Sequence, residues 1–131
     1  MKLEQWQSAW QQLTGAGSPF EVVTQAQGGA KRFRHTAPHV WAVIDSGRVH
    51  GEREFLVWEQ QRLTFSQFFD QVDRLAGQLV QRFGVRQGDR VAIAMRNQPA
   101  WLVAFAAIQR CGGVCVPLNS WGLRDELFHG L

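Results

Sequence analysis

The sequence predicts an α/β fold that contains a β-hairpin and a βαβ unit with parallel strands. Two short apolar runs, 55–58 and 63–65, flank a polar connection at 59–62, which is typical of a hairpin. Residues 65–83 carry apolar side chains at helical spacing. Two continuous apolar runs, 90–95 and 114–118, lie on either side of an apolar helical segment, as in parallel strands buried on both faces.

The clearest change in sequence character lies near residue 54. The chain has 131 residues, enough for one hydrophobic core. We expect residues 1–53 to form an N-terminal helical and irregular segment, and residues 54–131 to form a partial α/β subdomain. In the first segment, a glycine- and proline-rich breaker at 15–19 separates a first helix from a short apolar stretch at 20–23. A second helix is expected from near Pro38 to just before Gly47.

The first predicted helix carries an apolar stripe made of Leu3, Trp6, Trp10 and Leu13. Such a stripe could lie on a membrane surface, but its neighbours are Gln and Ser rather than Lys and Arg. Packing of the stripe on the core is therefore the favoured interpretation.

The strongest helix signal begins after Thr64, which is predicted to cap it. Gln67 stands three residues later as the partner in a capping box, and Gly84 ends the helix. Asp70 and Arg74 are expected to form an exposed pair on this helix. The apolar stripe consists of Phe65, Phe68, Phe69, Val72, Leu75, Ala76, Leu79, Val80 and Phe83.

The predicted βαβ unit begins with the strand at 90–95 after a turn at 84–89. Asn97 is expected to cap the next helix, which accepts Pro99 in its first turn and ends at Gly112-Gly113. This helix is apolar nearly all round, so we expect it to be buried, with its alanines allowing close approach to the sheet. A second strand at 114–118 stops at Pro117, and the connection is expected to be right-handed. A final helix begins around 123–127.

Composition excludes several classes of protein. Apolar residues make up 45% of the chain, which argues for folding rather than disorder. The net charge of +3 is spread along the chain, so nucleic acid is not an expected partner; the local cluster at 31–34 is better read as a solvated loop or an extended edge. No apolar run is long enough to span a membrane, and the first residues lack the apolar stretch of a secretory signal, so we expect a cytoplasmic location.

No catalytic, cofactor-binding or metal-binding residue emerges from the motifs. The loop at 96–100 after the first parallel strand contains no glycine, so it lacks the phosphate-binding fingerprint, and no Walker sequence occurs. Cys111 and Cys115 are read as small buried hydrophobes rather than metal ligands, with His129 the only nitrogen ligand nearby. The remaining candidates form no known catalytic pattern; they are His35, His39, His50, Ser46, Ser66 and Ser120.

The combined order of several sequence blocks resembles the N-terminal region of the AMP-forming acyl-CoA synthetases, the adenylate-forming family that includes fatty-acyl-CoA ligases. One block contains Gly88-Asp89-Arg90, and another contains Asn97-Gln98-Pro99. Residues 20–22 and 53–57 are similar to the bacterial acyl-CoA ligase branch. The full set of matching blocks comprises residues 63–65, 75–79, 83–93, 97–101 and 112–119.

The resemblance implies a two-step reaction, in which a carboxylate attacks ATP and coenzyme A then displaces AMP. It implies ATP, Mg²⁺ and CoA for a complete family enzyme, but the family's phosphate loop and catalytic lysine are not among these residues. The family features that the resemblance implies for this sequence are structural ones, namely the Gly88-Asp89-Arg90 turn and the Asn97 cap. Ala100 stands where the family commonly has a glutamate, which weakens any expectation of a charge at that helix start.

We therefore expect an N-terminal fragment of an ATP-dependent acyl-CoA synthetase that does not catalyse alone. The alternatives are a non-catalytic interaction module that docks on a separate chain, and a free-standing nucleotide-binding domain. The expected partners are the remainder of the enzyme or a second copy of the chain. A partial sheet would leave strand edges and apolar faces exposed, which predicts self-association or marginal stability.

Overall fold

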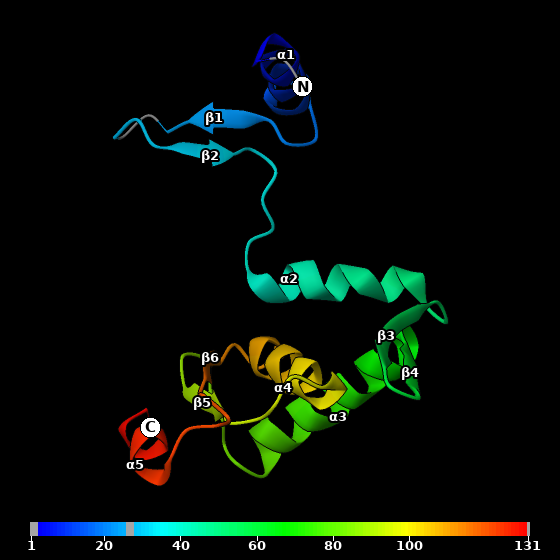
Figure 1. The fold of residues 1–131 in the computed structure, drawn as a ribbon, viewed down its shortest axis with the longest axis vertical. Coiled ribbons are helices and arrows are strands. Elements are labelled where there is room, and N and C mark those ends of the chain that lie inside the picture. Colours follow the sequence, from blue (N-terminus) through cyan, green and yellow to red (C-terminus); the bar gives the residue numbers. More distant parts are fainter. Residues whose placement is uncertain (1–2, 26–27, 131) are drawn as a thin grey trace. The chain divides into compact units, whose positions relative to one another are not determined.

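The computed structural model describes residues 3–25 and 28–130, which fall into two compact units (Figure 1). The first unit extends to Pro38 and the second begins at His39. The predicted mixture of helices and small sheets is confirmed: helices alternate with strands that pair in three two-stranded sheets.

The first unit contains one helix and one small hairpin. Helix α1 (Leu3–Thr14) is the predicted first helix, and the breaker after it contains Gly17 at a positive φ of 78°. Strands β1 (Val22–Thr24) and β2 (Lys31–Phe33) pair antiparallel, with Val22 opposite Phe33. The basic cluster therefore forms an exposed edge strand, which was one of its two predicted structures. Helix α1 has no buried residue within its own unit, and the expected packing of its apolar stripe on the core stays a prediction.

A buried carboxylate joins the parts of the first unit. Glu21, only 7% exposed, accepts a hydrogen bond from the Gly17 backbone N–H at 3.0 Å and another from Arg34 Nε at 2.6 Å. Its own backbone carbonyl accepts from the Arg34 N–H at 2.7 Å. Glu21 thus links the loop after α1 to the residue that follows β2. The Gly17 N–H and then Arg34 lower the pKa of this carboxyl against the opposing effect of burial.

The second unit begins with a short helical segment and the predicted hairpin. Helix α2 (Val40–Asp45) is capped by His39, whose Nδ1 accepts from the Ala42 N–H at 3.1 Å, and it continues into the 3₁₀ helix η1 (Ser46–His50). Strands β3 (Glu54–Trp58) and β4 (Gln61–Thr64) pair antiparallel. Their connection is shorter than the predicted 59–62, because Trp58 already pairs with Gln61.

Helix α3 (Phe65–Gln81) has the capping box that the sequence predicts. The Gln67 backbone N–H donates to Thr64 Oγ1 at 3.2 Å, and the Gln67 side chain accepts from the Thr64 N–H at 3.0 Å. Gly84, at a φ of 68°, ends the helical region, and its N–H returns to the Val80 carbonyl at 3.1 Å. Both ends of α3 are therefore determined by local residues.

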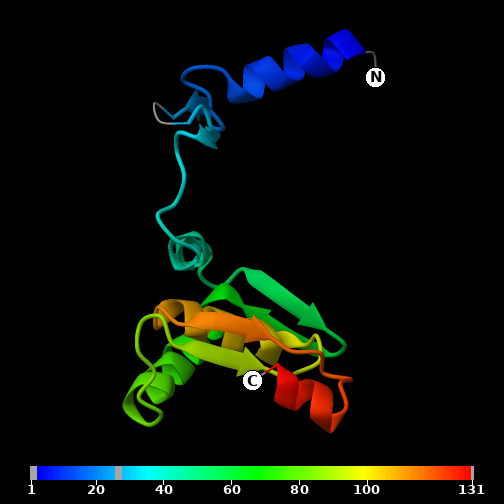
Figure 2. The same cartoon turned by 90° about the vertical axis from the view of Figure 1, so that its left-hand side faces the viewer.

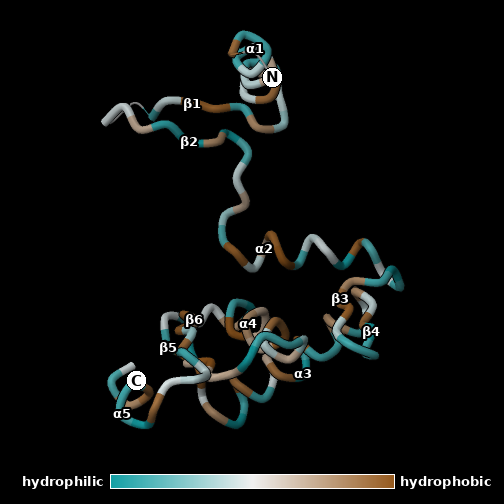
Figure 3. Tube along the Cα trace, in the orientation of Figure 1, coloured by the Kyte–Doolittle hydropathy of each residue, from teal (hydrophilic) through white to brown (hydrophobic). Residues whose placement is uncertain are grey.

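The apolar stripe of α3 is buried over only part of its length. Phe68, Phe69, Val72 and Ala76 lie in the core, whereas Val80 and Phe83 at the far end are exposed. In Figure 3, hydrophilic positions recur along α3 between the hydrophobic ones, as expected for an amphipathic helix.

The predicted βαβ unit is present as β5 (Arg90–Ile93), α4 (Pro99–Arg110) and β6 (Val114–Pro117). The strands are parallel, with Val91 opposite Cys115. Figure 2 shows the two strands side by side with α3 and α4 behind them. The turn before β5 is held by the Asp89 carboxylate, which accepts from the Arg86 N–H at 2.8 Å.

Two expectations for the βαβ unit are wrong. Asn97 does not cap α4: the N-cap is Gln98, whose side chain makes no capping bond, and Pro99 fixes the first turn instead. The strands are not buried on both faces, since Ile93 is the only fully buried residue among those of β5 and β6. Helix α4 contacts both strands.

The core of the second unit lies where α3 and α4 cross (Figure 1). Ala76 of α3 and Ala106 and Ala107 of α4 are all buried in it. The alanines of α4, predicted to face the sheet, thus bring the helix close to α3. Trp41 and Ile44 of α2 and Leu56 of β3 pack around this contact.

Asp73 joins three helical segments at the edge of this core. Its Oδ1 accepts from Arg48 Nη2 of η1 at 2.7 Å and from Arg110 Nη1 of α4. Arg48 also pairs with Asp45 at 2.8 Å, and Asp73 is the main reason that the pKa of the Arg48 guanidinium is raised. The expected Asp70–Arg74 pair is not among the ion pairs of the described residues.

The described residues end with α5 (Arg124–His129), a single short helix. The Glu126 carboxylate accepts from the Leu123 N–H at 3.0 Å and closes its first turn. Within residues 3–25 and 28–130, no helix has both the length and the apolar character needed to cross a membrane.

We predict that Glu21→Gln loosens the β1–β2 hairpin, because Arg34 and the Gly17 N–H then lose a charged acceptor. Since the folded pKa is lowered, the carboxylate stabilises the unit above the ordinary pKa of glutamate, and this contribution is lost as the pH falls through the folded pKa. Amide hydrogen exchange of β1 and β2 measures the effect. Glu4→Gln, an exposed charge change on α1, is the control; equal exchange in both variants would refute the role of Glu21.

We predict that Asp73→Asn lowers the free energy of unfolding by roughly 0.5–1.5 kcal/mol, the sum of two half-exposed ion pairs after solvent screening. Urea unfolding followed by circular dichroism measures the loss, which should shrink in 1 M salt. Asp70→Asn on the same helix is the matched control, because it removes the same charge from an exposed position that forms no ion pair with the described residues. A loss as large in the control would show that net charge, not pairing, is responsible.

Candidate functional site

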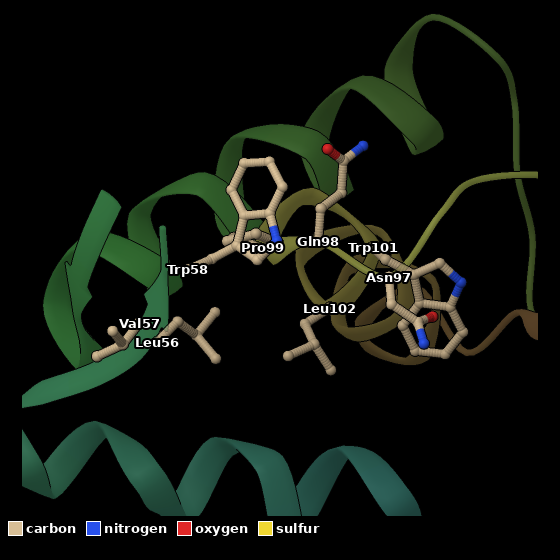
Figure 4. A pocket seen from close by; sticks show the side chains of 8 residues that line it. All are labelled: Leu56, Val57, Trp58, Asn97, Gln98, Pro99, Trp101 and Leu102. Atoms are coloured by element: carbon tan, nitrogen blue, oxygen red, sulfur yellow. The ribbon is translucent and has the colours of Figure 1, made fainter. Parts of the chain in front are cut away.

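The main candidate site of the second unit is a hollow near the start of α4, the main hollow (Figure 4). It has a volume of about 340 Å³ and lies between β3 and the first turn of α4. Pro99 fixes the helix start, and the side chains of Trp58 and Trp101 form aromatic walls. The lining residues are Leu56, Val57, Trp58, Asn97, Gln98, Pro99, Trp101 and Leu102.

The chemistry of this hollow is that of an apolar surface with two amides. Asn97 and Gln98 supply its carboxamides, which donate and accept hydrogen bonds but do not transfer protons near neutral pH. No acid, base or thiol is among its lining residues. The hollow can therefore hold an apolar group in place, but it cannot by itself activate one.

A second hollow of about 300 Å³ is lined by phenylalanines of α3, β3 and α4 together with residues of α2 and η1. Its polar side chains are already engaged: Ser46 Oγ donates to the Val43 carbonyl at 2.7 Å, and the His50 ring lies 4.8 Å from the Phe65 ring. This hollow is continuous with the packing of the core rather than with a set of reactive groups.

The loops after β5 and β6 meet at the carboxyl ends of the parallel strands, where α/β folds commonly bind ligands. Arg96 from the first loop lies over the ring of Trp121 from the second, with its Cζ 3.8 Å from the ring centroid. Asn119 Oδ1 accepts from the Trp121 N–H at 3.0 Å. These contacts hold the two loops together. The loop after β5 contains no glycine at 96–100, so it lacks the glycine-rich sequence of a phosphate-binding loop.

The two cysteines, expected to be buried, are half-buried. The Cys111 thiol contacts the Ala76 carbonyl at 3.5 Å, and burial raises the pKa of both Cys111 and Cys115. His129 is exposed at the end of α5. Among the described residues, no group of three or more His, Cys, Asp or Glu side chains is placed to hold a metal ion.

Among the histidines and serines considered as catalytic candidates, Ser46 and His50 line the second hollow together, and the others hold separate positions. His39 caps α2, His50 packs on Phe65, and His35 lies 4.0 Å from the Glu21 carboxylate in the first unit. Ser66 lies at the start of α3, where its backbone N–H donates to the Gly51 carbonyl at 2.9 Å. Ser120 lies in the loop after β6.

Sequence reasoning missed the two carboxylates that organise the units, Glu21 and Asp73. A signal existed for Glu21: it interrupts an apolar stretch, and a basic cluster follows about ten residues later, the pattern of a charge pair across a hairpin. Asp73 borders the apolar stripe of α3, but its partners Arg48 and Arg110 are 25 and 37 residues away. Such distant pairing is not visible in one sequence.

The model of the family described as AMP-binding enzyme matches residues 44–130. The chain belongs to this family. The predicted resemblance to adenylate-forming enzymes is thereby confirmed, and the matched region lies within the unit that holds the hairpin and the βαβ unit.

Relatives in this family carry several different activities in their names. The chain is 40% identical over 73 residues to an acetyl-coenzyme A synthetase of Allorhizobium ampelinum, covering 51% of this chain and 11% of that enzyme. It is 34% identical over 87 residues to a medium/long-chain-fatty-acid–CoA ligase of Mycobacterium tuberculosis, covering 66% of this chain and 14% of the ligase. The chain thus spans less than a fifth of the length of these relatives.

Solved structures agree with the sequence match. The NpsA N-terminal subdomain of Klebsiella oxytoca superimposes with a TM-score of 0.65 at 26% identity, covering 71% of this chain and 24% of that one. The o-succinylbenzoate coenzyme A synthetase of Bacillus subtilis, solved with AMP, gives 0.60 at 30% identity and covers 70% of this chain and 24% of the synthetase. The chain therefore resembles the N-terminal part of adenylate-forming enzymes.

The described residues do not fit the groups that the family implies. ATP requires donors for its phosphates and Mg²⁺ requires oxygen ligands, yet the main hollow offers two carboxamides and apolar walls. No acidic cluster for a metal is formed in residues 3–25 and 28–130. No step of an adenylation reaction is assigned to these side chains.

We predict that Cys111 and Cys115 react slowly with iodoacetamide at pH 7.5, because burial raises their pKa and limits access. Mass spectrometry of the folded chain should show labelling at least tenfold slower than in the same chain unfolded in urea. Single variants Cys111→Ala and Cys115→Ala assign the rates. Labelling of either thiol at the unfolded rate would contradict the packed environment.

Proposed function

We propose that this chain supplies the N-terminal scaffold of an ATP-dependent acyl-CoA synthetase, with adenylation and thioester formation carried out by residues outside it. The main support is the combination of a family match over 44–130 with a main hollow that is lined by apolar side chains and two carboxamides. The region would shape the enzyme without contacting the reacting atoms.

The proposal does not specify which carboxylic acid the complete enzyme activates. Relatives of similar identity are named for acetate, for 4-hydroxybutyrate and for medium- and long-chain fatty acids. Because the same segment occurs with such different acids, we infer that it does not select the substrate. A role in fatty acid metabolism and a cytoplasmic location are part of the proposal.

One observation favours the alternative of a non-catalytic module that docks on a separate chain. The β5–β6 sheet has only two strands, and Val114 and Trp121 beside it are exposed. Apolar residues next to open strand edges need a cover, which could come from another chain as well as from the same one. Co-purification of the chain with a separate synthetase polypeptide would favour this alternative.

The first test asks whether the chain adenylates. Given ATP, Mg²⁺ and acetate, octanoate or palmitate, the purified 131-residue chain should release no pyrophosphate above a mock purification. An intact acetyl-coenzyme A synthetase is the positive control. Pyrophosphate release that requires the chain, ATP and an acid together would contradict the proposal that residues outside this chain carry out adenylation.

The second test asks whether the region is a competent scaffold. Residues 44–130 replace the matching segment of the Bacillus subtilis synthetase. We expect the chimera to fold, judged by a cooperative thermal transition, and to keep measurable adenylation of o-succinylbenzoate. A chimera that folds and binds AMP but has no activity would show that the segment contributes directly to the chemistry.

A further inference from the structure

The main hollow combines flat ring-shaped walls with the size of a small-molecule site. Its volume of about 340 Å³ lies within the range of about 300–1,000 Å³ that is usual for ligand pockets. Figure 4 shows the Trp58 ring on its β3 side and the Trp101 ring on its α4 side. Pro99, the buried first residue of α4, adds a third ring. A planar aromatic ligand can stack on the tryptophans, which adds to the stabilisation that apolar burial gives.

Two carboxamides at the start of α4 have no hydrogen-bond partner among the described residues. Gln98 is the N-cap residue, but its side chain makes no capping bond, and the Asn97 side chain makes no hydrogen bond either. Each carboxamide has an oxygen that accepts hydrogen bonds and a nitrogen that donates them. Both groups line the main hollow, so they are available to a ligand rather than used by the fold.

The lining of the main hollow favours an uncharged ligand. All eight lining residues are uncharged, so an ionised group placed there would lose hydration without gaining an opposite charge. A neutral amide can instead pair with a carboxamide through one donated and one accepted hydrogen bond. We propose that the main hollow binds an uncharged aromatic carboxamide, with its ring against the tryptophan walls and its amide group at Asn97 and Gln98. This binding is additional to the scaffold role and does not depend on it.

The exposed rim of the hollow sets the expected affinity. Val57, Trp58 and Leu102 are 52%, 37% and 38% exposed, so a bound ring stays partly in contact with water. For a ligand of the size of benzamide that is only partly buried, we expect a dissociation constant between about 0.5 and 10 mM. Exchange of such a weak ligand is fast, so the NMR signals of the contacted side chains move gradually as the ligand is added.

An NMR titration of the 131-residue chain with benzamide, up to about 50 mM, tests the proposal. The indole N–H signals of Trp58 and Trp101, assigned with single Trp→Phe variants, should shift together and saturate with one dissociation constant. The signals of Trp6 and Trp121, which do not line the hollow, should stay in place. Benzoate has the same ring with a charge, and cyclohexanecarboxamide has the same amide without an aromatic ring. Each should bind at least threefold more weakly than benzamide.

Two variants separate this site from general apolar binding. Trp58→Leu keeps an apolar side chain on β3 but removes an aromatic wall, and Asn97→Ala removes a carboxamide that makes no hydrogen bond within the described chain. Each should raise the dissociation constant for benzamide at least threefold. Trp121→Leu is the matched control, because Trp121 is a 72% exposed tryptophan of the same unit that does not line the hollow. The signals of residues far from each substitution check that the variants fold.

Three results would overturn the proposal. The first is the absence of a saturable shift of the Trp58 and Trp101 signals, which is also the result expected if another part of the chain fills the hollow. The second is binding of benzoate or cyclohexanecarboxamide as tight as that of benzamide. The third is loss of binding in Trp121→Leu, or unchanged binding in both Trp58→Leu and Asn97→Ala. Adenylation by the purified chain would contradict the scaffold proposal alone, so the two proposals fail by different measurements.

Discussion

The second unit depends on the close approach of α3 and α4. The contact contains three alanines, Ala76, Ala106 and Ala107, whose side chains are single methyl groups. The two helix backbones can therefore come close together, and Val72 and Val103 are buried beside the alanines. Trp41 of α2 and Leu56 of β3 pack on this pair. Because β5 and β6 are joined to the two ends of α4, the position of that helix also sets where the parallel strands lie.

The same arrangement explains why the parallel strands remain half covered. Their inward residues pack against α4, whereas Arg90, Ala92 and Val116 border a hollow on the other face. Parallel strands in complete α/β folds are normally covered on both faces. The solved relatives are about four times longer than the superimposed region. This size difference is consistent with a scaffold whose second face is covered by further polypeptide.

Features controlled by neighbouring residues could be predicted from the sequence, and features controlled by distant ones could not. The Thr64–Gln67 capping box and the end at Gly84 follow from contacts within a few residues. The pairing of Asp73 with Arg110 depends on how α3 meets α4. The hollow at the start of α4 was missed for the same reason, since it joins Trp58 to Trp101 across forty residues.

The carboxylates of the described chain also limit what it can do chemically. Glu21 accepts hydrogen bonds from Gly17 and Arg34, and Asp73 accepts from two guanidinium groups. The hydrogen bonds from the Gly17 N–H and Arg34 lower the pKa of Glu21 and make it a poor proton acceptor, which is the opposite of what a general base requires. These acids therefore position segments of the chain relative to one another. Their use in structure, together with the two carboxamides of the main hollow, supports the scaffolding role that we propose for this chain.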